Sequence, residues 1–65
     1  MKEHDRVRIK SGRLKGCKGD ILEIVADDEM EAYRVALVEV TPEAHTRGYR
    51  VEDSVDMDRH ELEPT

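Results

Sequence analysis

The chain has 65 residues, of which 11 are Lys or Arg and 16 are Asp or Glu, so its net charge is −5. A chain this short predicts a single domain over residues 1–65 and leaves no room for a dinucleotide-binding fold or a barrel enzyme. No segment reaches the roughly 20 apolar residues of a membrane span, the first residues carry no signal segment, and the single Cys makes no internal disulfide. We therefore expect a cytoplasmic protein without a membrane partner.

The first part of the chain alternates apolar and polar residues in segments that we predict to be strands. Over Asp5–Lys10, Val7 and Ile9 share one face and basic residues share the other, which is typical of a half-buried strand. A polar loop, Ser11–Gly16, follows. A second strand is predicted over Cys17–Val25, where the apolar residues break strict alternation and indicate a bulge or a strong bend.

The middle of the chain predicts a hairpin. Ala26–Ala32 carries four acidic residues and no apolar stripe, so we interpret it as a hairpin loop. Tyr33–Val40 is the most β-prone segment and predicts the third strand, which Pro42 ends because proline has no amide donor for a sheet. We expect Glu43–Arg47 to be a loop.

The last part predicts two short strands. Gly48–Glu52, with Tyr49 and Val51, is assigned as the fourth strand. Asp53–Arg59 is interpreted as a turn or one turn of 3₁₀ helix with Ser54 as its cap, and His60–Glu63 as the last strand. Five strands predict an all-β barrel or sandwich, whose closure would protect the sheet edges. The expected core is Val7, Ile9, Ile21, Ile24, Val35, Leu37, Val51 and Leu62.

The segment from Asp5 to Ile24 has a pattern of glycine and apolar residues that is shared with a known family. It reads Asp5-x-Val7-x-Ile9-x-x-Gly12-x-x-x-Gly16-x-x-Gly19-x-Ile21-x-x-Ile24. This segment resembles the KOW motif, and Arg59–Pro64 resembles the closing strand of SH3-like barrels. The resemblance implies a five-stranded SH3-like barrel. It also implies RNA or protein partners, because KOW modules occur in transcription factors and ribosomal proteins, and SH3-like barrels include peptide binders and accessory subunits of enzymes.

Three glycines have structural roles that do not depend on the family. Gly12 and Gly16 bound a tight loop and supply the positive φ that such loops need. Gly19 is expected where the second strand passes close to another backbone.

The charges are unevenly distributed along the chain. Residues 1–18 have a net charge of +5, residues 19–46 of −7 and residues 47–65 of −3. The basic strand and loop are a candidate phosphate-binding surface, or else the solvated face of a strand paired with acidic loops. Its residues are Arg6, Arg8, Lys10, Arg13, Lys15 and Lys18. The acidic loop is a candidate for docking on a basic protein, or else a solvated hairpin tip. Its residues are Asp27, Asp28, Glu29 and Glu31.

The remaining candidate ligands give weaker signals. His4, His45, His60 and Cys17 lack the close spacing of structural zinc sites, so we expect neither a metal nor a cofactor. Cys17 is interpreted as a small apolar strand residue rather than a nucleophile.

The two tyrosines are the only aromatic residues of the chain. Tyr33 is expected in the core or at the barrel rim, and Tyr49 is the better candidate for an exposed binding residue in a peptide groove.

We expect a binding module without catalytic activity. The acidic net charge and the shortage of aromatic residues favour a protein partner over nucleic acid, and the chain is expected to be a monomer or weak dimer. The first alternative is an RNA-, ribosome- or transcription-associated module that uses the basic strand and loop. The second is an accessory subunit of an enzyme, which predicts an exposed apolar patch around Leu14, Leu22 or Val38.

Overall fold

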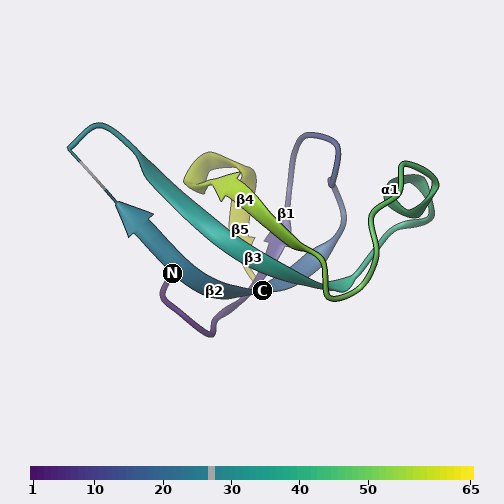
Figure 1. The fold of residues 1–65 in the computed structure, drawn as a ribbon, viewed down its shortest axis with the longest axis horizontal. Coiled ribbons are helices and arrows are strands. Elements are labelled where there is room, and N and C mark those ends of the chain that lie inside the picture. Colours follow the sequence, from purple (N-terminus) through teal and green to yellow (C-terminus); the bar gives the residue numbers. More distant parts are fainter. Residues whose placement is uncertain (27) are drawn as a thin grey trace.

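A computed structural model describes residues 1–26 and 28–65 of the chain. Five strands form one antiparallel sheet in the order β4-β3-β2-β1-β5 (Figure 1), which confirms the all-β prediction. The elements in chain order are β1 (Arg6–Ile9), β2 (Lys18–Ala26), β3 (Glu31–Glu39), the helix α1 (Pro42–Thr46), β4 (Ser54–Asp58), the 3₁₀ turn η1 (Arg59–Glu61) and β5 (Leu62–Pro64).

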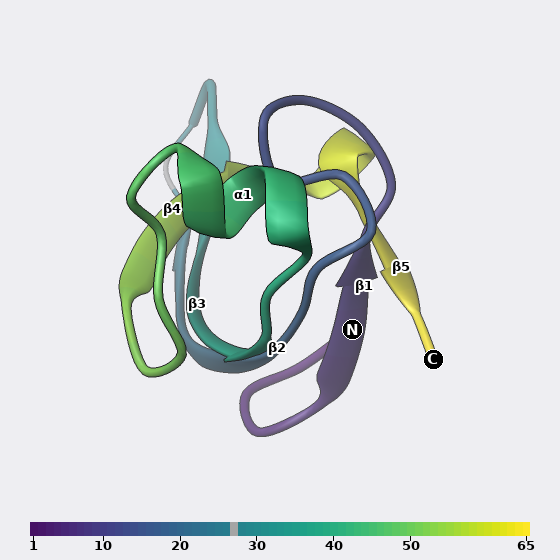
Figure 2. The same cartoon turned by 90° about the vertical axis from the view of Figure 1, so that its right-hand side faces the viewer.

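The sheet curls into a trough. Figure 2 shows β4 on one side, β1 and β5 on the other, and α1 across one end. Among the described residues no ladder joins the edge strands β4 and β5, so the predicted closure into a hydrogen-bonded barrel is not part of the observed sheet.

The long strand β2 produces much of this curvature. It pairs with β1 through Lys18–Asp20 and with β3 along its whole length. Its pairing with β3 shifts register between Lys18 and Gly19 and again between Ile21 and Glu23. Such irregularities bend a strand and increase its twist, so the predicted bulge is confirmed.

The three predicted structural glycines have the expected roles. Gly12 and Gly16 have φ values of +85° and +91°, in the region that favours glycine. At Gly19 a Cβ atom would lie 2.6 Å from the carbonyl oxygen of Ala36 on β3. The prediction that β2 approaches another backbone at this residue is therefore confirmed.

The core fills the concave side of the curled sheet. Six of the eight predicted core residues are buried, and Ile24 packs partly buried against them. Val51 is the exception, with 55% of its surface exposed, so its assignment to the core was wrong. The buried hydrophobic residues are Val7, Ile9, Leu14, Cys17, Ile21, Tyr33, Val35, Leu37, Ala44, Met57 and Leu62.

The segment between β3 and η1 corrects three predictions. The predicted loop Glu43–Arg47 is largely the helix α1, because Thr41 caps its first turn and Pro42 provides a preset helical φ at its start. The predicted strand Gly48–Glu52 lies in turns, and Glu52 has a φ of +78°. The fourth strand instead occupies Ser54–Asp58, which was predicted to be a turn.

The 3₁₀ turn lies later than predicted. It spans Arg59–Glu61 and is capped by Asp58 rather than by Ser54. The Asp58 carboxylate accepts from the His60 amide at 2.8 Å, and the Glu61 carboxylate accepts from the Asp58 amide at 3.3 Å. This reciprocal capping ends β4 and directs the chain into β5.

Candidate functional site

The basic face of β1 is neutralised by cross-strand partners. The register places Arg6 opposite Asp20 and Arg8 opposite Glu63, and each guanidinium forms an ion pair with that carboxylate. The hydrogen bond to Asp20, followed by the charge of that carboxylate, raises the pKa of the Arg6 guanidinium above its ordinary value. Lys18 also lies 3.8 Å from the Glu39 carboxylate. Three of the six candidate phosphate-binding residues are therefore paired with carboxylates of the sheet.

The other three candidate phosphate-binding residues are not paired with carboxylates of the described chain. Lys10, Arg13 and Lys15 lie in the loop between β1 and β2, and none of them forms an ion pair with a residue of the described ranges. The loop is closed by two hydrogen bonds: the Gly16 amide donates to the Ile9 carbonyl at 2.8 Å, and the Ile9 amide donates to the Cys17 carbonyl at 2.9 Å. The loop cations are thus presented on a fixed backbone.

A fourth cation, Arg47, reaches this loop from the residue that follows α1. The Nη1 atom of Arg47 donates to the carbonyl oxygen of Arg13 at 3.0 Å, across 34 residues of sequence. Arg47 also forms no ion pair in the described part of the chain. The bond holds the Arg47 guanidinium against the backbone of the β1–β2 loop.

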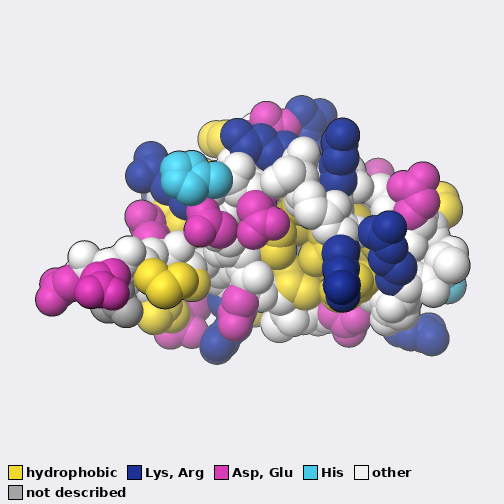
Figure 3. Space-filling model, turned by 90° about the horizontal axis from the view of Figure 1, so that it is seen from above, with side chains coloured by type: hydrophobic (Ala, Val, Ile, Leu, Met, Phe, Trp, Pro, Cys, Tyr) yellow, Lys and Arg dark blue, Asp and Glu magenta, His cyan; other side chains and the backbone are white. Residues whose placement is uncertain are grey.

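A groove of about 370 Å³ is lined in part by Arg13. We call it the groove and define it by its apolar residues Leu14, Tyr49, Val55 and Met57 and its charged residues Arg13, Asp56 and Glu61. Figure 3 looks onto this side of the molecule and shows hydrophobic side chains at the surface with Lys and Arg side chains next to them. The groove is thus built by the β1–β2 loop, the α1–β4 segment, β4 and η1.

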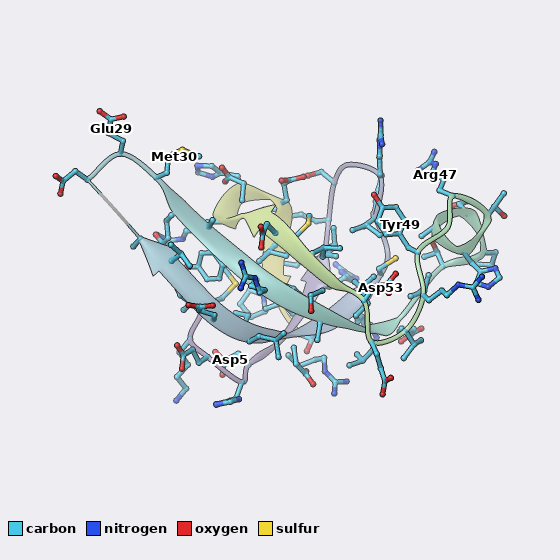
Figure 4. The ribbon with its side chains drawn as sticks, viewed as in Figure 1. Asp5, Glu29, Met30, Arg47, Tyr49 and Asp53 are labelled. Atoms are coloured by element: carbon cyan, nitrogen blue, oxygen red, sulfur yellow. The ribbon has the colours of Figure 1, made fainter. Side chains whose placement is uncertain are left out.

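Short-range hydrogen bonds position Tyr49 in the groove. Gly48 ends α1 with a φ of +101°, and the Tyr49 amide donates to the Ala44 carbonyl at 3.1 Å. After Tyr49, the Arg50 amide donates to the Asp53 carboxylate at 2.9 Å, which fixes the turn before β4. Figure 4 shows Tyr49, Arg47 and Asp53 together at this end of the molecule.

The acidic residues of the groove already have partners. Asp56 accepts from Arg34 at 3.3 Å, and Arg34 also pairs with Glu23. Glu61 accepts from the Asp58 amide in the cap of η1. Among the charged residues that line the groove, Asp56 is thus paired with a cation, whereas Arg13 and Glu61 form no ion pair with a described residue.

The acidic hairpin lies far from the groove. Figures 1 and 4 show the β2–β3 tip at the opposite end of the molecule from α1, and Glu29 and Met30 lie on it. Asp28 and Glu29 are exposed, whereas Glu31 is half-buried and accepts from the Tyr33 hydroxyl. Asp27, the fourth predicted acid, lies outside the described residues. The structure thus separates the acidic and basic candidates.

The three histidines and Cys17, which were considered as metal ligands and not expected to bind a metal, lie outside the groove. Residues 1–26 and 28–65 contain no group of three or more His, Cys, Asp and Glu side chains arranged to hold a metal ion. Cys17 is fully buried, and its sulfur accepts from the Thr41 amide at 3.5 Å, which confirms that it packs as a small apolar residue, although it lies just before β2 rather than in a strand. In the described chain no helix has the length and apolar character needed to cross a membrane.

Sequence reasoning missed most of the groove. Leu14 was named for an exposed patch, yet only 4% of its surface is exposed, so that assignment was wrong. Leu22 is exposed and Val38 is half-buried. Val55 and Met57 were placed in a turn, although their alternation with Ser54, Asp56 and Asp58 is the period-two signal of a strand. Nothing in the sequence indicated that Arg47 contacts the β1–β2 loop.

Comparison with protein families, with curated proteins and with solved structures finds no match to this chain.

Proposed function

We propose that this chain is a non-catalytic binding module for a protein partner, and that it binds through the groove. The observation that carries the proposal is the combination of apolar side chains and charge in one concave surface of about 370 Å³. Ligand sites in proteins are commonly concave surfaces of this size with an apolar lining and a few polar groups that fix orientation. The corresponding fold proposal is an SH3-like barrel of the KOW type, which the curled sheet and the loop glycines support.

Nucleic acid is the second candidate partner. The specific observation in its favour is the set of loop cations Lys10, Arg13 and Lys15, which have no ion pair with described residues. Against it stand the pairing of Arg6, Arg8 and Lys18 with acids and the presence of Tyr49 as the one aromatic side chain beside the groove. Single-strand binding usually relies on several stacked aromatic residues. Of the three residues named for the apolar patch of the accessory-subunit alternative, Leu22 is exposed, Val38 is half-buried and Leu14 is buried.

Selection from a library of random peptides tests the proposed function. Peptides selected on the wild-type protein should lose at least about tenfold in affinity on the Tyr49→Ala variant, because the side chain removed lines the groove. The matched control is Leu22→Ser, a change at an exposed residue that does not line the groove. An amide correlation spectrum of each variant checks that the fold is intact.

The same samples separate the two partner classes. Single-stranded RNA and DNA are titrated into the labelled protein at low and at moderate salt. If only the oligonucleotides bind, with affinity that falls steeply as salt rises, the protein-partner proposal is wrong. It is also wrong if the selected peptides bind the Tyr49→Ala and wild-type proteins equally well.

A further inference from the structure

A second hollow lies at the α1 end of the molecule and is separate from the groove. It has a volume of about 660 Å³ and forms where the end of β3 meets α1 and the turn that follows the helix. Figure 2 shows α1 across this end of the trough. We call this hollow the α1 pocket. Its lining residues, none of which lines the groove, are Val40, Pro42, His45, Thr46, Arg50 and Val51.

Hydrogen bonds fix the turn that forms one wall of the α1 pocket. The Arg50 amide donates to the Asp53 carboxylate at 2.9 Å, and the Asp53 amide donates to the Arg50 carbonyl at 3.1 Å. The Glu52 amide donates to the Leu37 carbonyl of β3 at 2.8 Å. Because the backbone on both sides of Val51 is held in this way, Arg50 and Val51 keep their places in the wall of the pocket.

The apolar part of the α1 pocket is incompletely covered by the chain. Val40 is half-buried and packs against the core, whereas 55% of the surface of Val51 is exposed. Pro42 is also exposed and lines the pocket with them. An apolar group of a ligand that contacts these three side chains removes their surface from water and gains free energy in proportion to the area covered.

The charged part of the α1 pocket is basic. Arg50 and His45 are its titratable lining residues, and no Asp or Glu of the described chain lines it. The Arg50 guanidinium forms no ion pair within residues 1–26 and 28–65. The neighbouring acids Glu43, Glu52 and Asp53 lie outside the lining, and Asp53 is engaged with the Arg50 amide. The charge complementary to this lining is therefore negative.

The apolar and basic parts of the α1 pocket lie close together, because Arg50 and Val51 are successive residues of one turn. A ligand must therefore present an anion and an apolar group within a short distance of each other. The last residue of a protein chain carries a carboxylate and a side chain on the same Cα atom. In an extended internal segment, side chains on one face are two residues apart, about 7 Å. Guanidinium groups match the geometry of a carboxylate with paired donors.

We propose that the α1 pocket binds the C-terminal residue of a partner protein. The free carboxylate of that residue meets Arg50, and its apolar side chain packs against Val40 and Val51. His45 supplies a further donor, because an imidazole carries an N–H group in both its neutral and its protonated form. The pocket is separate from the groove, so binding there is independent of the proposed function.

The test uses three five-residue peptides with acetylated N-termini, titrated into the labelled protein at low salt. The first has the sequence Gly-Ser-Gly-Ser-Leu and a free carboxylate, the second is its C-terminal amide, and the third ends in Ser with a free carboxylate. We expect the first to bind about fivefold more tightly than the amide, the order expected for one exposed charge pair. The peptide ending in Ser should also bind at least about fivefold more weakly, because it lacks the apolar side chain. The amide signals of Arg50 and Val51 should shift on binding.

Two variants with matched controls test the two parts of the α1 pocket. Arg50→Gln should abolish the preference for the carboxylate over the amide, whereas Arg59→Gln removes an exposed arginine that does not line the pocket and should keep it. Val51→Ser should weaken binding of the peptide that ends in Leu. Val25→Ser changes a valine of similar exposure, 50%, outside the pocket and should leave binding unchanged. An amide correlation spectrum of each variant checks that the fold is intact.

Three contrary outcomes would overturn the inference. The first is equal binding of the carboxylate and the amide to the wild-type protein, or an unchanged preference in Arg50→Gln. The second is equally tight binding of an amidated peptide with Glu next to an internal Leu, because the ligand would then not be a chain end. The third is equally tight binding of isovalerate, which would indicate a small free acid instead of a protein. The peptide selection on Tyr49→Ala decides the proposed function separately, because Tyr49 lines the groove and not the α1 pocket.

Discussion

Gly19 is the residue at which the sheet leaves no room for a side chain. Its φ is outside the left-handed region, so its conformation alone does not require glycine. The requirement comes from β3, whose Ala36 carbonyl oxygen would lie 2.6 Å from an added Cβ atom. The constraint is therefore steric, in contrast to Gly12 and Gly16, whose backbone conformation itself favours glycine.

We predict that Gly19→Ala lowers the free energy of unfolding by about 1–3 kcal/mol, the usual cost of overpacking a close contact. Gly48→Ala is the matched control, because Gly48 has a positive φ but no atom within 4 Å of an added Cβ. It should cost about 1–2 kcal/mol through backbone strain alone. Urea unfolding measures both. Unchanged stability of Gly19→Ala would show that β2 and β3 separate at this point without cost.

Tyr33 makes the free energy of unfolding decrease at alkaline pH. Its hydroxyl donates to the Glu31 carboxylate, and this bond, followed by burial, raises the pKa of Tyr33 above its ordinary value. The neutral phenol is therefore favoured in the folded state. Its contribution is fully present below the pKa of an unfolded tyrosine, about 10, and is lost as the pH rises through the folded pKa.

We predict that Tyr33→Phe removes this alkaline component. The variant should be less stable than the wild type at pH 8, where the hydrogen bond is present, and the difference should shrink as the pH rises above about 10. Urea unfolding at pH 8 and pH 11 measures it, with Tyr49→Phe as the control for loss of a phenol. Equal losses of stability in wild type and Tyr33→Phe between the two pH values would contradict the prediction.

At the level of elements, the region between β3 and β5 was the least predictable. Tyr49 and Val51 alternate with polar residues and imitate a strand, yet turns and the helix end decide their conformation. The signals for α1 are present as Thr41, Pro42 and Gly48, but a helix of five residues has no room for an apolar stripe. Short elements of this kind are stabilised by tertiary contacts, here through buried Ala44.

The capping box of η1 links two elements and gives a direct prediction. Asp58→Ala should lower the free energy of unfolding by about 1 kcal/mol, because it removes the acceptor for the His60 amide at the start of η1. Asp58→Asn keeps an oxygen acceptor and should cost less than half as much. Thermal and urea unfolding of the two variants provide the measurement. Equal costs for Ala and Asn would show that the loss has another origin.

At the scale of the whole molecule, the fold rearranges the charges of the sequence. The antiparallel register pairs Arg6, Arg8 and Lys18 with acids from later strands, although the first 18 residues are strongly basic. Such exposed pairs each contribute only about 0–1 kcal/mol, so their main effect is to neutralise one face. The loop cations and the acidic hairpin remain at separate places on a molecule 36 Å long.

The sequence alone determined the β class, four of the five strands, most of the core and the roles of three glycines. These features follow from local periodicity and from backbone sterics, which neighbouring residues largely set. Tertiary structure decided the position of β4, the neutralisation of the basic strand and the whole of the groove. Arg13 meets Arg47, and Leu14 meets Tyr49 and Met57, only after segments distant in the chain have packed together. Contacts of this kind form between segments that lie 34 residues or more apart in the chain, so they depend on the complete fold rather than on neighbouring residues.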